Sequence, residues 1–179
     1  MNYKILFEQY LQEQLNIQDS MQYSVYYTLL NGGNRFRPLL TLIWCNISGG
    51  RVEDALPLAA AIECIHTMSL IQDDLPCMDN AKERRGQTCL HLHTDESNAI
   101  LTSDYLLQLS FTFILSSNLS NYQKLLALEV LNQAILSTID GQNKELHNSI
   151  TTVDNYLDIH TNKTGSLLAA AAELGVIAA

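Results

Sequence analysis

The chain has 179 residues, a length that suits one folded domain built around one core. Hydrophobic residues make up 47% of it and charged residues 16%, which supplies a sizeable core and argues against a disordered chain. The formal net charge of −9 repels nucleic-acid phosphates, which excludes DNA or RNA binding driven by electrostatic attraction.

The sequence carries no signal for export, membrane insertion or disulfide formation. Its N-terminal segment contains Glu8 and Glu13 and no uninterrupted apolar stretch, so it predicts neither a signal peptide nor a transit peptide. The closest candidate for a membrane span, 167–179, is too short and contains Glu173, so we expect none. The four cysteines form no CxxC pair, and we expect reduced thiols in a cytoplasmic protein.

Helical periodicity runs through the longer stretches of the chain, and strand-like alternation is nearly absent. Pro38 suits the first turn of a helix, and Gly49 and Gly141 are plausible helix stops. The segment 94–115 is apolar on nearly every side, which predicts a place inside a bundle. The sequence therefore predicts an all-α fold, a bundle of six or more helices. In chain order, the predicted helices cover 2–15, 38–48, 55–72, 94–115, 122–140 and 153–179.

Three carboxylates, Asp73, Asp74 and Asp79, lie within seven residues directly after an apolar helix. Magnesium prefers oxygen ligands and often bridges protein carboxylates to substrate phosphates. The alternative is a solvated helix end, where paired carboxylates cost nothing. Pro76 disfavours helical geometry at the residue before it, so we expect the helix to end near Asp74 and a loop to bring Asp79 back.

Arginines lie on both sides of this carboxylate cluster in the sequence. Arg84 and Arg85 follow it, and guanidinium groups match phosphate oxygens in a bidentate manner. Before it, a pair of glycines leads into Arg35, Arg37 and a helix start, which favours an anion site, with an ordinary surface loop as the alternative. Gly165 lies inside a helical pattern at a cost of about 1 kcal/mol relative to alanine, which indicates a bend or a close approach.

Together these motifs resemble the trans-polyprenyl diphosphate synthases, which include the farnesyl and geranylgeranyl diphosphate synthases. The resemblance covers most of the chain and rests on motifs in family order: GGNRFRP, ECIHTMSLIQDDLPCMDN, RRG, AILTSDYLL, GQ and HTNKTG. It implies an all-α bundle of the isoprenoid synthase type around a central cavity. It also implies a Mg2+-dependent prenyltransferase that condenses isopentenyl diphosphate with dimethylallyl, geranyl or farnesyl diphosphate.

The resemblance also implies roles for individual residues. Asp73, Asp74 and Asp79 would form the catalytic Asp-rich motif, with Asp73 and Asp79 as the metal ligands. Cationic and polar side chains would hold the substrates: isopentenyl diphosphate by Arg37, His66 and Arg85, and the allylic diphosphate by Arg84, Lys163 and Thr164.

Product length is implied by Met68, the fifth residue before the first Asp of the motif. Farnesyl-producing members usually carry tyrosine at this position. Methionine is smaller and more flexible, so it would block the cavity less, and a geranylgeranyl product is favoured over a farnesyl product.

The sequence departs from the family pattern at several positions. Asn34 stands where the family has lysine, which removes one cation from the isopentenyl diphosphate site, and Gln72 stands where histidine is usual. Nothing after Lys163 resembles the family's second Asp-rich motif, and the chain ends inside an apolar helical pattern. We therefore expect residues 1–179 to be the N-terminal portion of one such domain, lacking the C-terminal part with the second motif and having little synthase activity alone.

Two rival functions remain beside the synthase. A terpene cyclase also ionises diphosphates with an Asp-rich motif. However, the GxRxRP and RRG elements indicate an isopentenyl diphosphate site, which a cyclase does not need. A non-catalytic partner subunit of a complete synthase is the stronger rival, because one wall of the site would be missing. The resemblance implies a homodimer, whereas the partner-subunit function implies a heterodimer with a complete synthase.

Overall fold

The structure is a computed structural model that describes residues 2–15, 17–30, 32–147 and 151–179. The predicted all-α architecture is confirmed, with one two-stranded hairpin added to it. The four cysteines are free thiols. The elements in chain order are α1 (Tyr3–Gln14), α2 (Ser20–Leu29), α3 (Phe36–Ile47), α4 (Val52–Asp73), β1 (Glu83–Arg84), β2 (Gln87–Thr88), α5 (Leu90–His93), α6 (Glu96–Ser116), α7 (Asn121–His147), α8 (Val153–His160), the π-helical turn η1 (Thr161–Gly165) and α9 (Ser166–Ala178).

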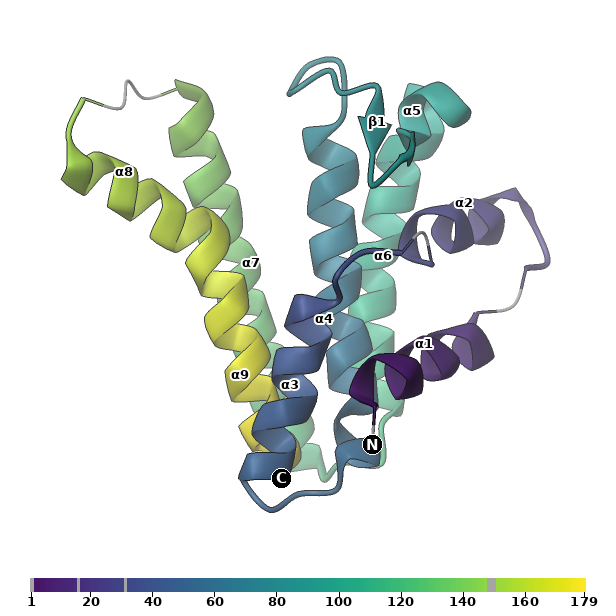
Figure 1. Ribbon diagram of the computed structural model, residues 1–179, viewed down its shortest axis with the longest axis vertical. Coiled ribbons are helices and arrows are strands. Elements are labelled where there is room, and N and C mark those ends of the chain that lie inside the picture. The colour runs from purple at the N-terminus through teal and green to yellow at the C-terminus, as the bar shows by residue number, and fades with distance from the viewer. Residues whose placement is uncertain (1, 16, 31, 148–150) are drawn as a thin grey trace.

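Figure 1 shows two groups of helices that approach each other at the end of the molecule where the termini lie. One group consists of α7, α8 and α9, and the other is centred on α4 and α6. Helix α3 joins them, because it packs against both α9 and α4. At the other end of the molecule, where α4 ends and the hairpin begins, the two groups of helices diverge (Figure 1).

Helix α4 lies at the centre of the core and packs against α3, α6 and α9. Helices α4 and α6 are long and apolar enough to cross a membrane, but the core helix of a globular fold has the same length and composition. In the most apolar 18-residue stretch of each helix, 72% of α4 is buried in the fold, against 39% of α6. Burial on this scale identifies α4 as the core helix, held in place by its apolar surface.

Helix α6 is only partly interior, which corrects the prediction for segment 94–115. One face packs on α4, but Ile100, Leu101 and Leu115 are exposed by 48%, 55% and 57%. An apolar pattern on all sides does not distinguish a helix inside one chain from a helix whose outer face meets another surface.

Three local features depart from the predictions. Helix α2 was not predicted, and Asp19 caps it by accepting a hydrogen bond from the Gln22 amide at 2.8 Å. The RRG motif forms the hairpin turn, with Arg85 and Gly86 at φ of 56° and 79°, as a tight two-residue turn requires. Helix α7 continues through Gly141, which is buried and does not end it.

Candidate functional site

A central cavity of about 350 Å³ lies between α4 and α7, as the resemblance implied. Ile65, Ile135 and Ile139 give it apolar walls, while η1 contributes polar groups. Such a cavity suits a ligand with a hydrocarbon chain and a polar head. The cavity is lined by six residues to which the resemblance assigned a role in substrate binding, metal binding or product length: Arg37, His66, Met68, Asp73, Lys163 and Thr164.

The carboxylate loop begins where α4 ends at Asp73. The backbone N–H of Asp79 donates to the carbonyl oxygen of Asp73 at 2.8 Å, which returns the loop to the helix end. Asn80 follows in a left-handed conformation with φ of 50°, and its N–H donates to the Leu75 carbonyl at 3.0 Å. The predicted helix end and return loop are therefore confirmed.

Asp73 and Asp79 offer carboxylate oxygens, the donor type that a divalent cation such as Mg2+ prefers. Asp73 is half-buried and Asp79 exposed, and neither carboxylate bonds to another side chain within the part of the chain that the structure describes. Burial raises the pKa of Asp73, the Lys163 cation opposes that shift, and the Asp79 charge adds to it. No cluster of three or more metal-binding side chains occurs in the described ranges. Mg2+ held here would take its other ligands from water and phosphate oxygens.

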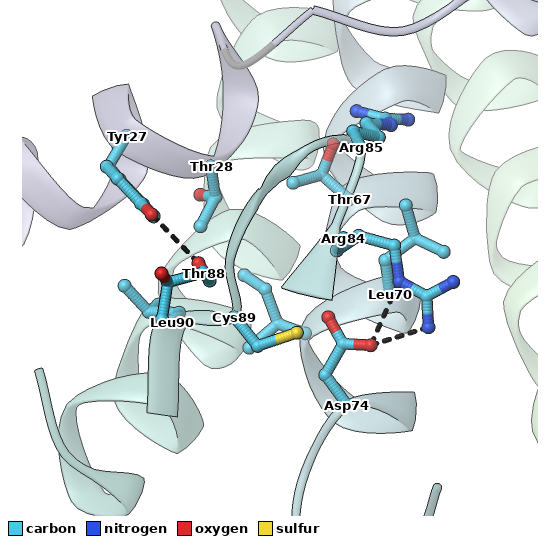
Figure 2. Close-up of a pocket in the computed structure, with 11 residues that line it drawn as sticks. Tyr27, Thr28, Thr67, Leu70, Asp74, Arg84, Arg85, Thr88, Cys89 and Leu90 are labelled. Carbon is cyan, nitrogen blue, oxygen red and sulfur yellow. Dashed lines mark hydrogen bonds and ion pairs between the residues drawn. The ribbon is translucent and has the colours of Figure 1, made fainter. Parts of the chain in front are cut away.

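Asp74 differs from the other two carboxylates, because it is 4% exposed and bound to Arg84. Both Nε and Nη2 of Arg84 donate to Asp74 Oδ1, at 2.9 and 2.5 Å (Figure 2). The hydrogen bond to Asp74 raises the pKa of the Arg84 guanidinium, and burial opposes that shift. Arg84 was expected at the allylic diphosphate; the structure shows it in a small pocket of about 40 Å³ under the hairpin, fixed by Asp74.

A second compartment of about 550 Å³ adjoins the central cavity and is called the arginine compartment below. It shares Arg37 and His66 with the central cavity, and Arg85 completes the set implied for isopentenyl diphosphate. Arg85 reaches it from the hairpin turn and donates Nη1 to the Gly32 carbonyl at 3.2 Å. Its lining is Gly33, Asn34, Arg35, Phe36, Arg37, Glu63, His66 and Arg85.

Arg35 has a structural role at the base of the arginine compartment. Its side chain is fully buried and binds Glu8 and Glu63, each at 2.7 Å, and the Leu29 carbonyl at 2.7 Å. Burial lowers the pKa of this guanidinium, but the hydrogen bond to Glu8 and the charge of Glu63 outweigh it and raise the pKa. Of the two arginines of the glycine motif, only Arg37 faces both compartments, where its buried Nε has no hydrogen-bond partner among the described residues.

His66 is neutral in this site. Burial lowers its pKa to about 3, and the charges of Arg37, Arg85, Arg35 and Arg84 act in the same direction. A neutral imidazole offers one donor and one acceptor nitrogen, so His66 can bind a phosphate oxygen without adding charge.

Lys163 lies in η1, a π-helical turn that ends at Gly165 and interrupts the α-helical geometry between α8 and α9. Its ammonium group pairs with Glu145 on α7. The close approach occurs at Gly141, where an added Cβ would lie 2.3 Å from the backbone nitrogen of Lys163. The absence of a side chain at Gly141 therefore lets α7 support the turn that carries Lys163 and Thr164.

Two site residues were missed by reasoning from the sequence. Gln142 lines the central cavity, and both polar atoms of its buried amide lack partners among the described residues. Its signal was the GQ motif itself. Glu63 is 1% exposed beneath three arginines, and its signal was that it is the lone charge in an otherwise apolar stretch, 55–65. A buried charge in such a stretch needs a partner.

Comparison with known proteins places this geometry in a family. The profile of the polyprenyl synthetase family matches residues 18–179. The chain is 43% identical to a geranylgeranyl diphosphate synthase of Cyanophora paradoxa, covering 87% of this chain and 54% of that one. It is 40% identical to geranylgeranyl pyrophosphate synthase 4 of Arabidopsis thaliana, covering 92% and 45%. The chain thus spans about half the length of these curated relatives.

Solved structures agree with the sequence matches. A geranyltransferase from Legionella pneumophila superposes with a TM-score of 0.93 at 32% identity, covering 99% of this chain and 66% of that one. A geranyltransferase from Helicobacter pylori complexed with magnesium and isoprenyl diphosphate superposes with a TM-score of 0.90 at 30% identity, covering 99% and 63%. The chain therefore belongs to the polyprenyl synthetase family.

Proposed function

We propose that the protein takes part in the Mg2+-dependent condensation of isopentenyl diphosphate with an allylic diphosphate. The observation that carries this proposal is the pair of adjoining compartments that share Arg37 and His66. One compartment combines apolar walls with Asp73 and Lys163, and the other is lined by arginines. Two diphosphates bound in this way would present their carbon chains to each other across the shared wall.

The side chains divide the work of the reaction. Lys163 and Thr164 would hold the allylic diphosphate, and Asp73 and Asp79 would hold Mg2+, which stabilises the negative charge of a departing diphosphate. The allylic carbon–oxygen bond breaks and diphosphate leaves. The double bond of isopentenyl diphosphate, oriented by Arg37, His66 and Arg85, then attacks the allylic carbon, and loss of a proton from the adduct restores a double bond.

The proposed product is geranylgeranyl diphosphate rather than farnesyl diphosphate. Met68 on α4 lines the central cavity with Ile135 on α7, so flexible and aliphatic side chains bound the space for the growing chain. The names of the relatives from Cyanophora paradoxa and Arabidopsis thaliana support the longer product. Mass analysis of the products with each allylic substrate tests this, and a farnesyl product alone would contradict it.

The site assignment is tested by calorimetric binding of isopentenyl diphosphate and geranyl diphosphate with and without Mg2+. We expect Mg2+ to strengthen geranyl diphosphate binding. Asp73→Asn or Asp79→Asn should raise the Kd measured with Mg2+ about tenfold or more, because each variant loses a charged metal ligand. Asp104→Asn, an exposed carboxylate on α6, is the matched control and should change nothing. A wild-type chain that binds neither diphosphate would overturn the proposal.

The second candidate function is that of a partner subunit. Its support is a relative at 38% identity, a heterodimeric geranylgeranyl pyrophosphate synthase large subunit of Arabidopsis thaliana. The exposed apolar residues of α6, Ile100, Leu101 and Leu115, support assembly, and a homodimer is our first proposal. Light scattering of the chain alone and turnover with and without a complete synthase separate the two functions. Turnover only in the mixture would favour the partner subunit.

The cytoplasm remains our proposed compartment, supported by the four free thiols, which a reducing compartment preserves. Five Arabidopsis thaliana relatives are chloroplastic by name, which makes a plastid the compartment to compare. Imaging of the chain with a C-terminal fluorescent tag distinguishes the two, and plastid signal would overturn the proposal.

A further inference from the structure

The arginine compartment has fewer free cations than its name suggests. Arg35 is fully buried and already paired with Glu8 and Glu63. The Arg85 Nη2 lies 3.7 Å from the Glu63 carboxylate, so this arginine is partly neutralised as well. Asn34 adds an exposed amide without charge. A diphosphate with two or more negative charges would find Arg37 as the one lining cation without a carboxylate partner among the described residues.

Lys4 brings another cation to the edge of this compartment. Its Nζ donates to the carbonyl oxygen of Gly33, a lining residue, at 3.1 Å. Among the described residues Lys4 has no carboxylate partner, and its side chain is exposed. A single hydrogen bond to a backbone carbonyl leaves the ammonium group free to turn toward a bound anion, because lysine has a flexible four-carbon stem and three donors.

Helix α1 holds Lys4 at this position through two independent features. The Asn2 side chain caps the helix by accepting from the amides of Lys4 and Ile5, at 3.1 and 3.2 Å. Glu8 follows one turn after Lys4 on the same face and binds the buried Arg35. Lys4 and Glu8 therefore attach α1 to the glycine motif at adjacent points.

We propose that Lys4 is a further diphosphate-binding residue, which supplies from α1 the cation that Asn34 does not supply from the glycine motif. The inference rests on the proposed function, because it takes the arginine compartment as the place where isopentenyl diphosphate binds. It differs from that proposal in assigning part of the binding to a helix outside the motifs that identify the family.

The test measures binding of isopentenyl diphosphate to the 179-residue chain by calorimetry at low and high salt. Lys4→Met should raise the Kd about fivefold at low salt, and the effect should shrink at high salt because an exposed charge is screened. Lys4→Arg, which keeps the charge, should bind within about twofold of wild type. Lys124→Met is the matched control, because Lys124 also donates its Nζ to a backbone carbonyl, that of Leu115 at 2.8 Å, away from the compartment.

Rescue separates a binding role from a structural one. Asn34→Lys places a cation in the same compartment, so Lys4→Met in the Asn34→Lys background should return the Kd to within about twofold of wild type. An unchanged Kd in Lys4→Met, an equal loss in Lys124→Met, or a loss that Asn34→Lys does not restore would each overturn the inference. A wild-type chain that binds no isopentenyl diphosphate would overturn the proposed function and this inference with it, whereas wild-type binding with an inert Lys4 would overturn the inference alone.

Discussion

The contact between Gly141 and η1 gives a prediction whose sign is opposite to the usual effect of replacing a glycine in a helix. Gly141 lies inside α7, where alanine would ordinarily stabilise by about 1 kcal/mol. Here the added methyl group would lie 2.3 Å from the backbone nitrogen and 2.7 Å from the Cα of Lys163. Backbone atoms cannot rotate away, so α7 and η1 must separate.

The magnitude follows from two opposing terms. Overpacking costs about 1–3 kcal/mol in measured cases, and contacts this short on backbone belong at the upper end. The gain in helix propensity offsets about 1 kcal/mol of it. We therefore expect Gly141→Ala to lower the free energy of unfolding by about 1–2 kcal/mol, which corresponds to roughly 2–8 °C in the melting temperature for a chain of this length.

Gly165 supplies the matched control. It has a right-handed helical conformation, with φ of −65°, and an added methyl group would meet no atom closer than 3.8 Å. Gly165→Ala should therefore be neutral or stabilising by up to about 1 kcal/mol. Urea unfolding followed by circular dichroism measures both variants. A Gly141→Ala variant as stable as Gly165→Ala would refute the close-packing argument.

Three further predictions follow from the charged groups. His66 has a pKa of about 3 in the fold and 6.5 as its ordinary value, so the unfolded chain binds a proton that the fold excludes, and the free energy of unfolding decreases as pH falls below 6.5. From pH 7 to pH 5 this amounts to about 1–2 kcal/mol, and His66→Asn should remove it from the pH profile. Glu63→Gln should destabilise by about 3 kcal/mol or more and Glu8→Gln by about 1 kcal/mol, because the Glu63 side chain is 1% exposed and that of Glu8 27%. Asp74→Asn should release Arg84 from its competing carboxylate and strengthen geranyl diphosphate binding several-fold without changing the dependence on Mg2+, measured by calorimetry; loss of that dependence would make Asp74 a metal ligand instead.

The parts of the fold that the sequence predicted well are those set by local signals. The helix over 55–72 is long and apolar, and Pro76 lies close enough to its end to fix where the carboxylate loop begins. The same loop then returns to the helix end through a hydrogen bond between Asp79 and Asp73. These residues are only six positions apart in the sequence, so local signals were enough to predict the contact.

The parts that it missed depend on contacts between distant residues. Helix α2 has a segment rich in aromatic and polar residues with modest helix propensity, and packing on α6 stabilises it. Gly141 was interpreted as a helix stop because its true partner, Lys163, is 22 positions away. Arg35 and Arg37 look alike in the sequence, yet Glu8 and Glu63, 27 and 28 positions from Arg35, bind it and leave Arg37 to the compartments.

The chain has a net charge of −9, yet it is proposed to bind two diphosphates. The ion pairs of its site residues explain how an acidic chain can bind these anions. Arg35, Arg84 and Lys163 each have a carboxylate partner, so a diphosphate must displace that carboxylate to gain the cation. Displacement is cheapest at the Lys163–Glu145 pair, whose side chains are 23% and 30% exposed, and most costly at Arg35, which is fully buried. Asp73 and Asp79 have no such cation to lose, so adding Mg2+ there raises the positive charge of the site without breaking an ion pair. The exposure of the carboxylate partner, 30% at Glu145 against 6% at Asp74 and 1% at Glu63, therefore predicts which cations exchange partners when an anion binds, and Lys163 is the first.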